Sequence, residues 1–243
     1  MSRQIKTLIP FTFLMLIIGC ADKNTEENRT KFDKILGAEN VETVDYLVSD
    51  FENDFLKRQY PNLDTENAYR QFLTEHRDDN TEKWNSISQK ARNKFKASKL
   101  RLEMYEFPDS VWILKNSTFD KIESDSLPFV DIPFPYIKSR YKYTNPNGTT
   151  DYTYSRSYRE NISETHYDSI INQEMNSPRF NYIGKYLQAL ESIKNKSNFH
   201  QEFYDKKRSL GVLYPMLADV MLLENIDLND KLNRRLIVLE LIY

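Results

Sequence analysis

Residues 136–158 have the sequence YIKSRYKYTNPNGTTDYTYSRSY, and this stretch decides the fold class because its residue pattern differs from that of the rest of the chain. Tyr141 and Tyr143 before the NPNG sequence, and Tyr152, Tyr154 and Tyr158 after it, are separated by even intervals, which is the spacing of one face of a β-strand. In this turn sequence, proline presets the φ angle of the second turn position, and Gly148 supplies the left-handed residue of a type I turn with a bulge. The stretch predicts a β-hairpin with strands Tyr136–Tyr143 and Tyr152–Tyr158.

The sequence around the hairpin also disfavours helices. Prolines occur at positions 108, 128, 133 and 135, and β-branched and aromatic residues are frequent. Proline removes a backbone donor and clashes with the preceding helical turn, so no long helix fits here. We therefore expect an irregular, β-containing insertion over about residues 107–161, with its strands between about Phe129 and Arg159.

On both sides of this insertion, apolar residues recur at intervals of three and four, the spacing of one helix face. The clearest example runs from Val44 to Phe55, and we expect it to end near Pro61 because proline disfavours the α conformation in the residue before it. Asp64 or Thr65 can cap the next helix. Helices are further expected over residues 66–76, from 81 past 95, from 163 to 193, over 198–210 and 215–223, and from 227 or 229 to the end.

These patterns together predict a mostly α-helical protein. Four successive amphipathic helices after the insertion imply antiparallel packing. The chain has five glycines, far apart, which disfavours turn-rich sandwiches and leaves no phosphate-binding glycine loop or GxSxG elbow. The expected fold is a helical bundle or array with a central irregular segment that carries the β-hairpin.

The amino-terminal residues have a different character from the rest of the chain. Arg3 and Lys6 precede an apolar run from Leu8 to Gly19, which is too short to span a bilayer but has the length of a secretory signal core. The run ends in Leu16-Ile17-Ile18-Gly19-Cys20. A small residue directly before a cysteine, after an aliphatic run, resembles the lipobox of bacterial lipoproteins.

This resemblance implies cleavage between Gly19 and Cys20, a thioether-linked diacylglycerol on Cys20, and acylation of the new amino terminus with a fatty acid such as palmitate. Ala21 after the cysteine, rather than Asp, resembles the pattern of Gram-negative lipoproteins that reach the outer membrane, on a face that the sequence does not specify. The expected organisation is a signal peptide over residues 1–19, a flexible tether over 20–31 and a single helical domain over 32–243.

Composition excludes several classes of function. Removing the leader removes Arg3 and Lys6, which takes the formal net charge from −2 to −4, so nucleic acid is not an expected partner. With the single cysteine lipidated, no thiol is left for a disulfide, a zinc site or a nucleophile. None of the three histidines has a metal-binding spacing, so we expect no metal, cofactor or catalytic residue. The basic run from Lys90 to Arg101 faces solvent, or alternatively contacts an anionic lipid or polyanion.

The hairpin tyrosines are the candidate functional residues. They lie at even spacing and therefore share strand faces: Tyr152, Tyr154, Arg156 and Tyr158 on the second strand, and Tyr141 and Tyr143 on the first. The interpretation that we favour is structural, with the rings packed across strands or on the helices, where a cross-strand pair contributes about 0.2 to 1 kcal/mol. The functional interpretation is a flat amphipathic recognition surface for a glycan or a protein.

The expected function is non-enzymatic binding or assembly by a lipid-anchored envelope protein, with the membrane as one partner and an envelope protein or glycan as another. The alternative is an envelope hydrolase, because two carboxylates that are distant in sequence need no local motif to meet in a fold. Two carboxylates facing each other across a deep cleft would favour the hydrolase. A shallow surface lined by tyrosines would favour binding.

Overall fold

The computed structural model describes residues 30–78, 86–115, 135–144, 148–158, 166–211 and 216–243. The expected signal peptide, Cys20 and most of the tether lie outside these ranges. The fold is mostly α, with a small antiparallel sheet near the middle of the chain, as predicted. None of the described helices is long and apolar enough to cross a membrane.

The first helices form an almost continuous rod. Helix α2 (Lys31–Leu36) and α3 (Ala38–Asp50) run into a π-helical segment (Phe51–Leu56) and the short α4 (Lys57–Gln59). The rod ends just before Pro61, as predicted. Helix α5 (Thr65–Arg77) begins after Asp64, whose side chain accepts the backbone N–H of Asn67 at 2.8 Å.

Helices α6 (Gln89–Ala97) and α7 (Lys99–Met104) follow. The helix expected to start near Thr81 begins at Gln89 instead, because the Ser88 hydroxyl accepts the backbone N–H of Ala91 and caps it there. Trp84, which we expected within this helix, lies outside the described residues.

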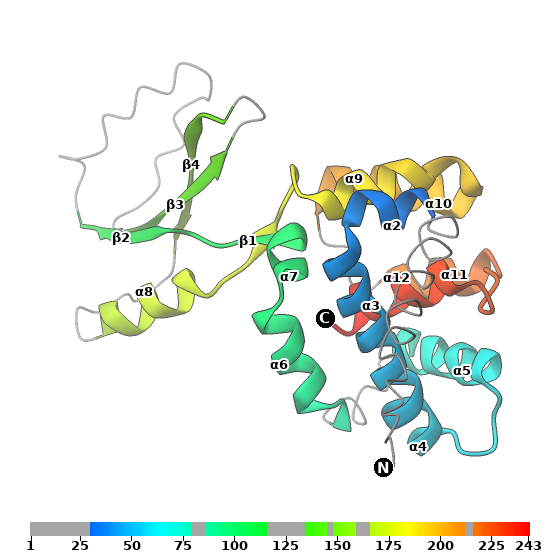
Figure 1. Cartoon of the computed structure of the whole chain (residues 1–243). Coiled ribbons are helices and arrows are strands. Elements are labelled where there is room, and N and C mark those ends of the chain that lie inside the picture. Colours follow the sequence, from blue (N-terminus) through cyan, green and yellow to red (C-terminus); the bar gives the residue numbers. More distant parts are fainter. Residues whose placement is uncertain (1–29, 79–85, 116–134, 145–147, 159–165, 212–215) are drawn as a thin grey trace, which may run out of the picture.

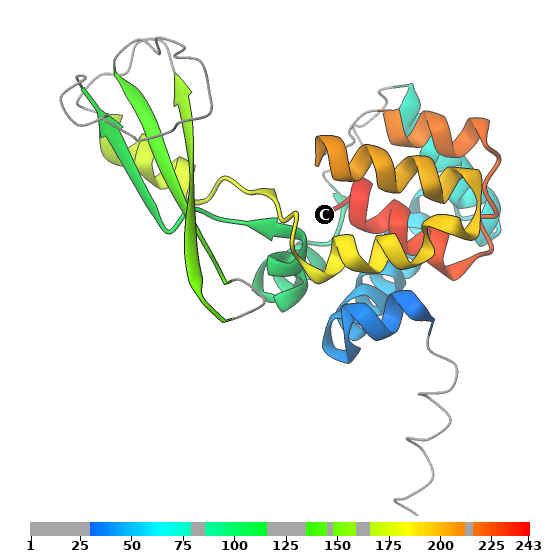
Figure 2. The ribbon, with the colours of Figure 1, turned by 90° about the horizontal axis from the view of Figure 1, so that it is seen from above.

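Four helices complete the helical body: α9 (Lys185–Ile193), α10 (Asn198–Leu210), α11 (Met216–Leu223) and α12 (Lys231–Leu241). Helix α10 has the predicted bounds, and Gly211 ends it with a φ of +73°. Helix α12 starts slightly later than expected because Asp230 caps it. Its residues Leu236 to Leu241 are all buried, so α12 runs through the core of the body (Figure 2).

The sheet has three antiparallel strands in the order β2 (Ser110–Leu114), β3 (Tyr136–Thr144) and β4 (Thr150–Tyr158). Strands β3 and β4 form the predicted hairpin, from the pair Tyr136 and Tyr158 to the pair Thr144 and Thr150. Gly148 has the left-handed φ of +83° that the turn prediction required. Residues 145–147 of the turn lie outside the described ranges.

Two expectations about the β structure are wrong. Strand β2 and the two-stranded ribbon β1 (Tyr105–Glu106) with β5 (Arg179–Phe180) lie outside residues 129–159, where we expected all strands. The ribbon also interrupts the helical stretch expected from 163 to 193, which is divided into α8 (Tyr167–Met175), β5 and α9. Strand β5 pairs with β1, which lies far away in sequence, and this pairing overrides the local helical spacing.

The sheet and α8 form a lobe that stands apart from the helical body (Figures 1 and 2). The main hydrophobic core includes no described residue between Met104 and Phe180. The β1–β5 ribbon connects the two parts. Arg179 of the ribbon donates to Glu106 at 2.9 Å and to Thr153 of β4 at 2.6 Å, and its guanidinium lies 3.5 Å from the centre of the Tyr141 ring. Arg179 therefore fixes the sheet to the ribbon. The expected end of the insertion, near residue 161, lies outside the described residues.

Candidate recognition surface

The two faces of the sheet differ in burial. Side chains alternate between the faces of a strand, so residues 137, 139 and 141 of β3 share one face and residues 138, 140 and 142 share the other. Ile137, Ser139 and Tyr141 are buried. Helix α8 packs against β2 alongside the sheet (Figure 1). One face therefore belongs to the interior of the lobe. The other is partly open to solvent over residues 138, 140 and 142, whereas Tyr136 at its end is buried.

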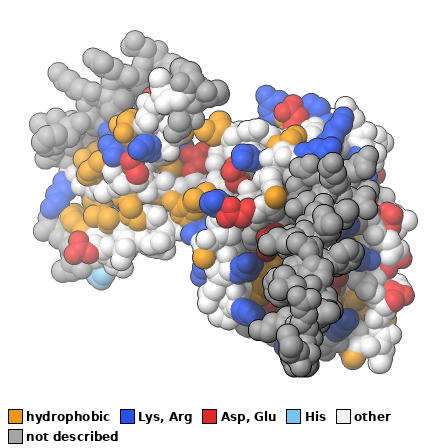
Figure 3. All heavy atoms as spheres, viewed as in Figure 1, with side chains coloured by type: hydrophobic (Ala, Val, Ile, Leu, Met, Phe, Trp, Pro, Cys, Tyr) orange, Lys and Arg blue, Asp and Glu red, His pale blue; other side chains and the backbone are white. Residues whose placement is uncertain are grey.

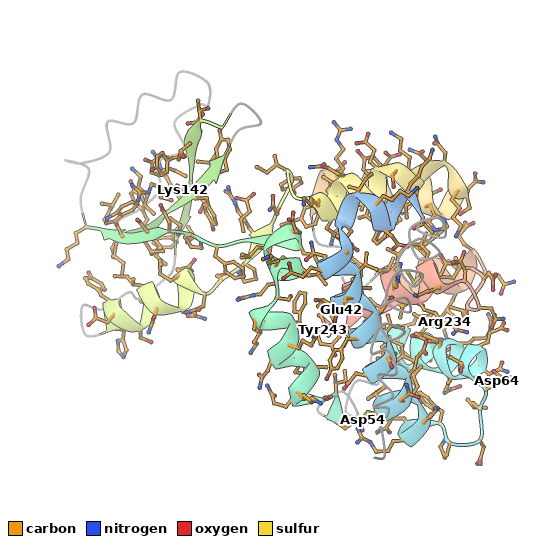
Figure 4. The ribbon with its side chains drawn as sticks, in the orientation of Figure 1. Glu42, Asp54, Asp64, Lys142, Arg234 and Tyr243 are labelled. Carbon is orange, nitrogen blue, oxygen red and sulfur yellow. The ribbon has the colours of Figure 1, made fainter. Side chains whose placement is uncertain are left out.

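The open face combines aromatic rings with cations. The strand register places its members together, and we call this set the aromatic-cationic face: Trp112, Lys138, Arg140, Lys142, Tyr152, Tyr154, Arg156 and Tyr158. Trp112, Tyr152, Tyr154 and Tyr158 are 40%, 42%, 50% and 47% exposed. Hydrophobic and basic side chains lie beside one another on this lobe in Figure 3, and Figure 4 labels Lys142 on the sheet.

Lys138 and Arg140 of the central strand lie near rings of the outer strands. The Lys138 ammonium is 5.1 Å from the centre of the Tyr154 ring. The Arg140 guanidinium lies 4.8 Å from the Tyr152 ring centre and 5.7 Å from that of Trp112. Cations over ring faces contribute about 0.5 to 1 kcal/mol at exposed sites. The contacts hold the rings in place, so a ligand meets a surface that is already ordered.

Asp109 orients the central arginine of this face. Its carboxylate accepts two hydrogen bonds from Arg140, at 2.8 and 3.0 Å, and Arg140 also donates to the Ser110 hydroxyl at 3.0 Å. The hydrogen bond from Arg140 lowers the pKa of Asp109, so the carboxylate stays ionised. Both partners are partly exposed, so the pair positions the guanidinium without removing it from solvent.

The structure divides the six predicted site residues between the two faces. Tyr152, Tyr154, Arg156 and Tyr158 lie together on the open face, and the expectation that the β4 tyrosines pack on the helices is wrong. Tyr141 is buried and pairs with Thr153, while Tyr143 pairs with Asp151, so these two tyrosines belong to the opposite face. Spacing within one strand shows which residues share a face. It does not show which face is buried, because that depends on the register with the neighbouring strands.

Half of the face was not predicted from the sequence, namely Trp112, Lys138, Arg140 and Lys142. Lys138, Arg140 and Lys142 alternate along β3, so their even spacing was a usable signal that they share one face. Trp112 had no such signal, because β2 reaches the hairpin only through pairing with β3. Its partner is Lys138, a residue separated from it by the segment that the structure does not describe.

The histidines and acidic clusters do not form a competing site. Among the described residues, no three His, Cys, Asp or Glu side chains gather into a possible metal site. His76 is buried in α5 with its ring 6.2 Å from that of Phe72. Ser197 caps α10, and its hydroxyl lies 2.7 Å from His200 Nδ1. Burial, followed by the charge of Lys196, lowers the pKa of His200, so this ring is neutral and serves the helix cap.

Three carboxylates line a pocket of about 350 Å³ beside His200, those of Glu224, Asp227 and Asp230. Asp227 accepts the backbone N–H of Asn229, and Asp230 accepts that of Leu232, each at 2.8 Å. Two of the three carboxylates are thus engaged in a turn and a helix cap. This arrangement gives no specific support to the hydrolase alternative.

Comparisons of the chain with known protein families, with curated proteins and with solved structures found no match.

Proposed function

We propose that this protein is a non-enzymatic, lipid-anchored lipoprotein of the cell envelope, located at the outer membrane, whose sheet lobe binds an acidic glycan. The observation that carries the proposal is the aromatic-cationic face, where four half-exposed rings and four cations lie side by side. The lipobox resemblance of residues 16–20 supports the location.

The chemistry of the face matches a polymer of acidic sugars. Sugar rings have apolar C–H faces that pack on tyrosine and tryptophan, and these side chains lose little conformational entropy on binding. Arginine binds carboxylate, sulfate or phosphate groups in a planar, bidentate geometry, while lysine acts as a mobile point charge. A ligand that carries both an apolar ring face and an anionic group satisfies both kinds of side chain at once.

The spacing of the face suits an extended chain. Alternate residues of a strand lie about 6.6 Å apart, and neighbouring strands lie about 4.8 Å apart. The cations of β3 therefore form a row about 13 Å long, with rings on both sides. Arg140 of this row bonds Asp109 and Ser110 through Nε and Nη2 and keeps the donors of Nη1, so it can bind an anion as well.

We expect the loss of the β4 tyrosines to weaken binding strongly and to change stability little. The test uses the chain from Ala21 onward with Tyr152, Tyr154 and Tyr158 changed to Ser, titrated with alginate and heparin as acidic probes and dextran as a neutral one. Each ring is worth about 1 kcal/mol, so the affinity for the acidic polymer that binds should fall about 100-fold. The thermal midpoint should stay nearly constant, because all three rings are about half exposed.

The matched control for this variant is Tyr182→Ser, since Tyr182 is equally exposed but lies in the helical body. This control should bind like the parent chain. Equal affinity for dextran, or the same loss in the control, would reject the acidic glycan. A different outcome would assign the face to a protein partner: no acidic polymer binds, whereas a purified envelope protein binds the parent chain and does not bind the triple variant.

The second prediction concerns the anchor. Replacing Cys20 by Ser should abolish labelling with a fatty-acid analogue and move the protein from the membrane fraction to the soluble fraction, because two or more acyl chains are needed for stable anchoring. Labelling and fractionation of cells that express each variant provide the measurement. Ala21→Asp is the control, since it keeps the acceptor cysteine and should retain the label. Persistent labelling of Cys20→Ser would exclude lipidation at this position.

A further inference from the structure

A second candidate site lies on the helical body, away from the aromatic-cationic face. A pocket of about 720 Å³ is bounded by α6, α7, the β1–β5 ribbon and the residues that follow α12. Its volume falls in the range of sites that hold small organic molecules, about 300 to 1,000 Å³. Figure 4 labels Tyr243 in this region, between α6 and α3.

The walls of the pocket are aromatic. Phe95, Tyr105, Phe180 and Tyr243 line it together with Ile87 and Ile242. The ring centres of Phe95 and Tyr243 are 5.5 Å apart, and those of Phe95 and Tyr105 are 6.4 Å apart. These contacts form an aromatic cluster that joins α6 to the ribbon on one side of the pocket.

The charged side chains that line the pocket are basic. Arg92, Lys96 and Arg101 line it, and no Asp or Glu is found among its described lining residues. Arg92 and Lys96 lie four positions apart on α6, so they share one side of that helix. The guanidinium of Arg101 is 3.9 Å from the centre of the Phe107 ring, which leaves its hydrogen-bond donors for another partner. Three cations beside an apolar wall favour a ligand with an anionic head.

The hydroxyl of Tyr243 is a further polar group at the pocket. This oxygen is buried and has no hydrogen-bond partner in the described part of the chain. Burial, followed by the charge of Asp50, raises the pKa of Tyr243, so the hydroxyl keeps its proton and remains a donor. A buried donor without a partner costs free energy, and a ligand oxygen would remove that cost.

From these features we infer that the pocket binds an amphipathic organic anion, with an acyl or aryl body against the aromatic wall and a carboxylate or phosphate beside Arg92 and Lys96. This site goes beyond the proposed glycan recognition and does not depend on it. Tyr105 and Phe180 belong to the ribbon that carries the sheet lobe, so the ligand contacts both sides of the connection. Binding is expected to slow amide exchange in β1 and β5.

The test uses laurate, kept below its critical micelle concentration, with dodecyltrimethylammonium as the probe of opposite charge. Calorimetric titration of the chain from Ala21 onward should show laurate binding and at least about tenfold weaker binding of the cation. Arg92→Gln with Lys96→Gln should weaken laurate binding at least about tenfold. The matched control is Lys90→Gln with Lys94→Gln, which makes the same charge change on the same helix outside the pocket and should have little effect.

Tyr243→Phe preserves the ring and removes the donor, so it tests the site without changing its charge. It should weaken laurate binding several-fold and leave the thermal midpoint unchanged or raised. If the α6 double variant does not fold, Lys96→Gln alone and Tyr243→Phe still decide the result. Equal binding of both amphiphiles, equal losses in the two double variants, or no laurate binding would each overturn the proposal.

Discussion

Replacing Lys207 by Met is expected to lower the free energy of unfolding by about 3 to 5 kcal/mol, because it leaves a buried carboxylate without its counter-ion. Lys207 of α10 donates to Glu240 of α12 at 2.6 Å, and the two side chains are 2% and 4% exposed. Glu240 also accepts the hydroxyl of Tyr186 from α9 at 2.5 Å. Equilibrium urea unfolding followed by circular dichroism gives the measurement.

Three helices meet at this carboxylate, which explains the size of the expected effect. Burial, followed by the charge of Glu240, raises the pKa of Tyr186, so the phenol remains a donor. The Lys207 ammonium also lies 4.6 Å from the centre of the Phe180 ring, at the ribbon that carries the sheet lobe. Loss of the ammonium therefore removes a contact between α10 and α12 and also a contact that holds β5 against α10.

Lys206→Met is the matched control, since Lys206 is the neighbouring residue and its contact with Glu202 is long, 3.7 Å, and exposed. An exposed pair of this kind contributes about 0 to 1 kcal/mol. Adding Glu240→Gln to Lys207→Met should restore part of the stability, because a neutral amide still accepts from Tyr186 and leaves no unpaired buried charge. Similar stabilities of the Lys207→Met and Lys206→Met variants would contradict the expected burial cost.

The elements that the sequence predicted well are those with a local signal. Helix α10 has a serine cap at Ser197 and a left-handed glycine at Gly211, and both of its ends were predicted correctly. The β3–β4 hairpin has its turn residues and its alternation in one continuous stretch. In both cases the interactions that define the element join residues close in sequence.

The elements that were missed depend on distant partners. Strand β2 pairs with β3, and β1 pairs with β5, across long stretches of chain. A segment of two residues such as Arg179–Phe180 carries too little pattern to indicate a strand, and its neighbours have helical spacing. The strand forms because Tyr105 and Phe180 pair in the folded chain. The local spacing of apolar residues carries no information about this pairing.

Only part of the candidate site could be predicted from the sequence, because the rest depends on contacts between residues distant in sequence. Spacing along β4 placed Tyr152, Tyr154 and Tyr158 on one face, but both faces of the hairpin carry tyrosines. Which face is open depends on the packing of the lobe, including α8 against β2, and this is a tertiary property. Burial of Tyr141 and exposure of Tyr154 follow from that packing rather than from residue type.

The second large effect is expected for Arg235, which joins the last helix to the first two. Its guanidinium donates to Asp33 of α2 at 2.5 Å and makes two hydrogen bonds to Asp45 of α3, at 3.0 and 2.6 Å. The arginine side chain is 4% exposed. Asp33 also completes the cap of α2, where its backbone N–H donates to Thr30 and its carboxylate accepts the N–H of Thr30.

Replacing Arg235 by Met should lower the free energy of unfolding by about 3 kcal/mol, near the lower end for a broken buried pair. The effect is limited because Asp45 is partly exposed and can be hydrated again, whereas Asp33 stays largely buried. Arg235→Lys should fall between the parent and the Met variant, because a point charge cannot reproduce the planar set of donors. Urea unfolding measures the loss, and amide exchange in α2 should accelerate.

Lys231→Met provides the control on the same helix face, one turn before Arg235. Lys231 contacts the same carboxylate, Asp45, at 3.0 Å, but its side chain is 66% exposed. The exposed pair of Lys231 and Asp45 should contribute less than about 1 kcal/mol to stability. Each variant removes one positive charge that contacts Asp45, and the two differ in how deeply that charge is buried. Because α2 follows directly on the expected tether, faster exchange in α2 of Arg235→Met would show that this buried arginine holds the tethered end of the domain in place. Equal stability of the two variants, with unchanged exchange in α2, would show that burial of Arg235 adds nothing to the pair.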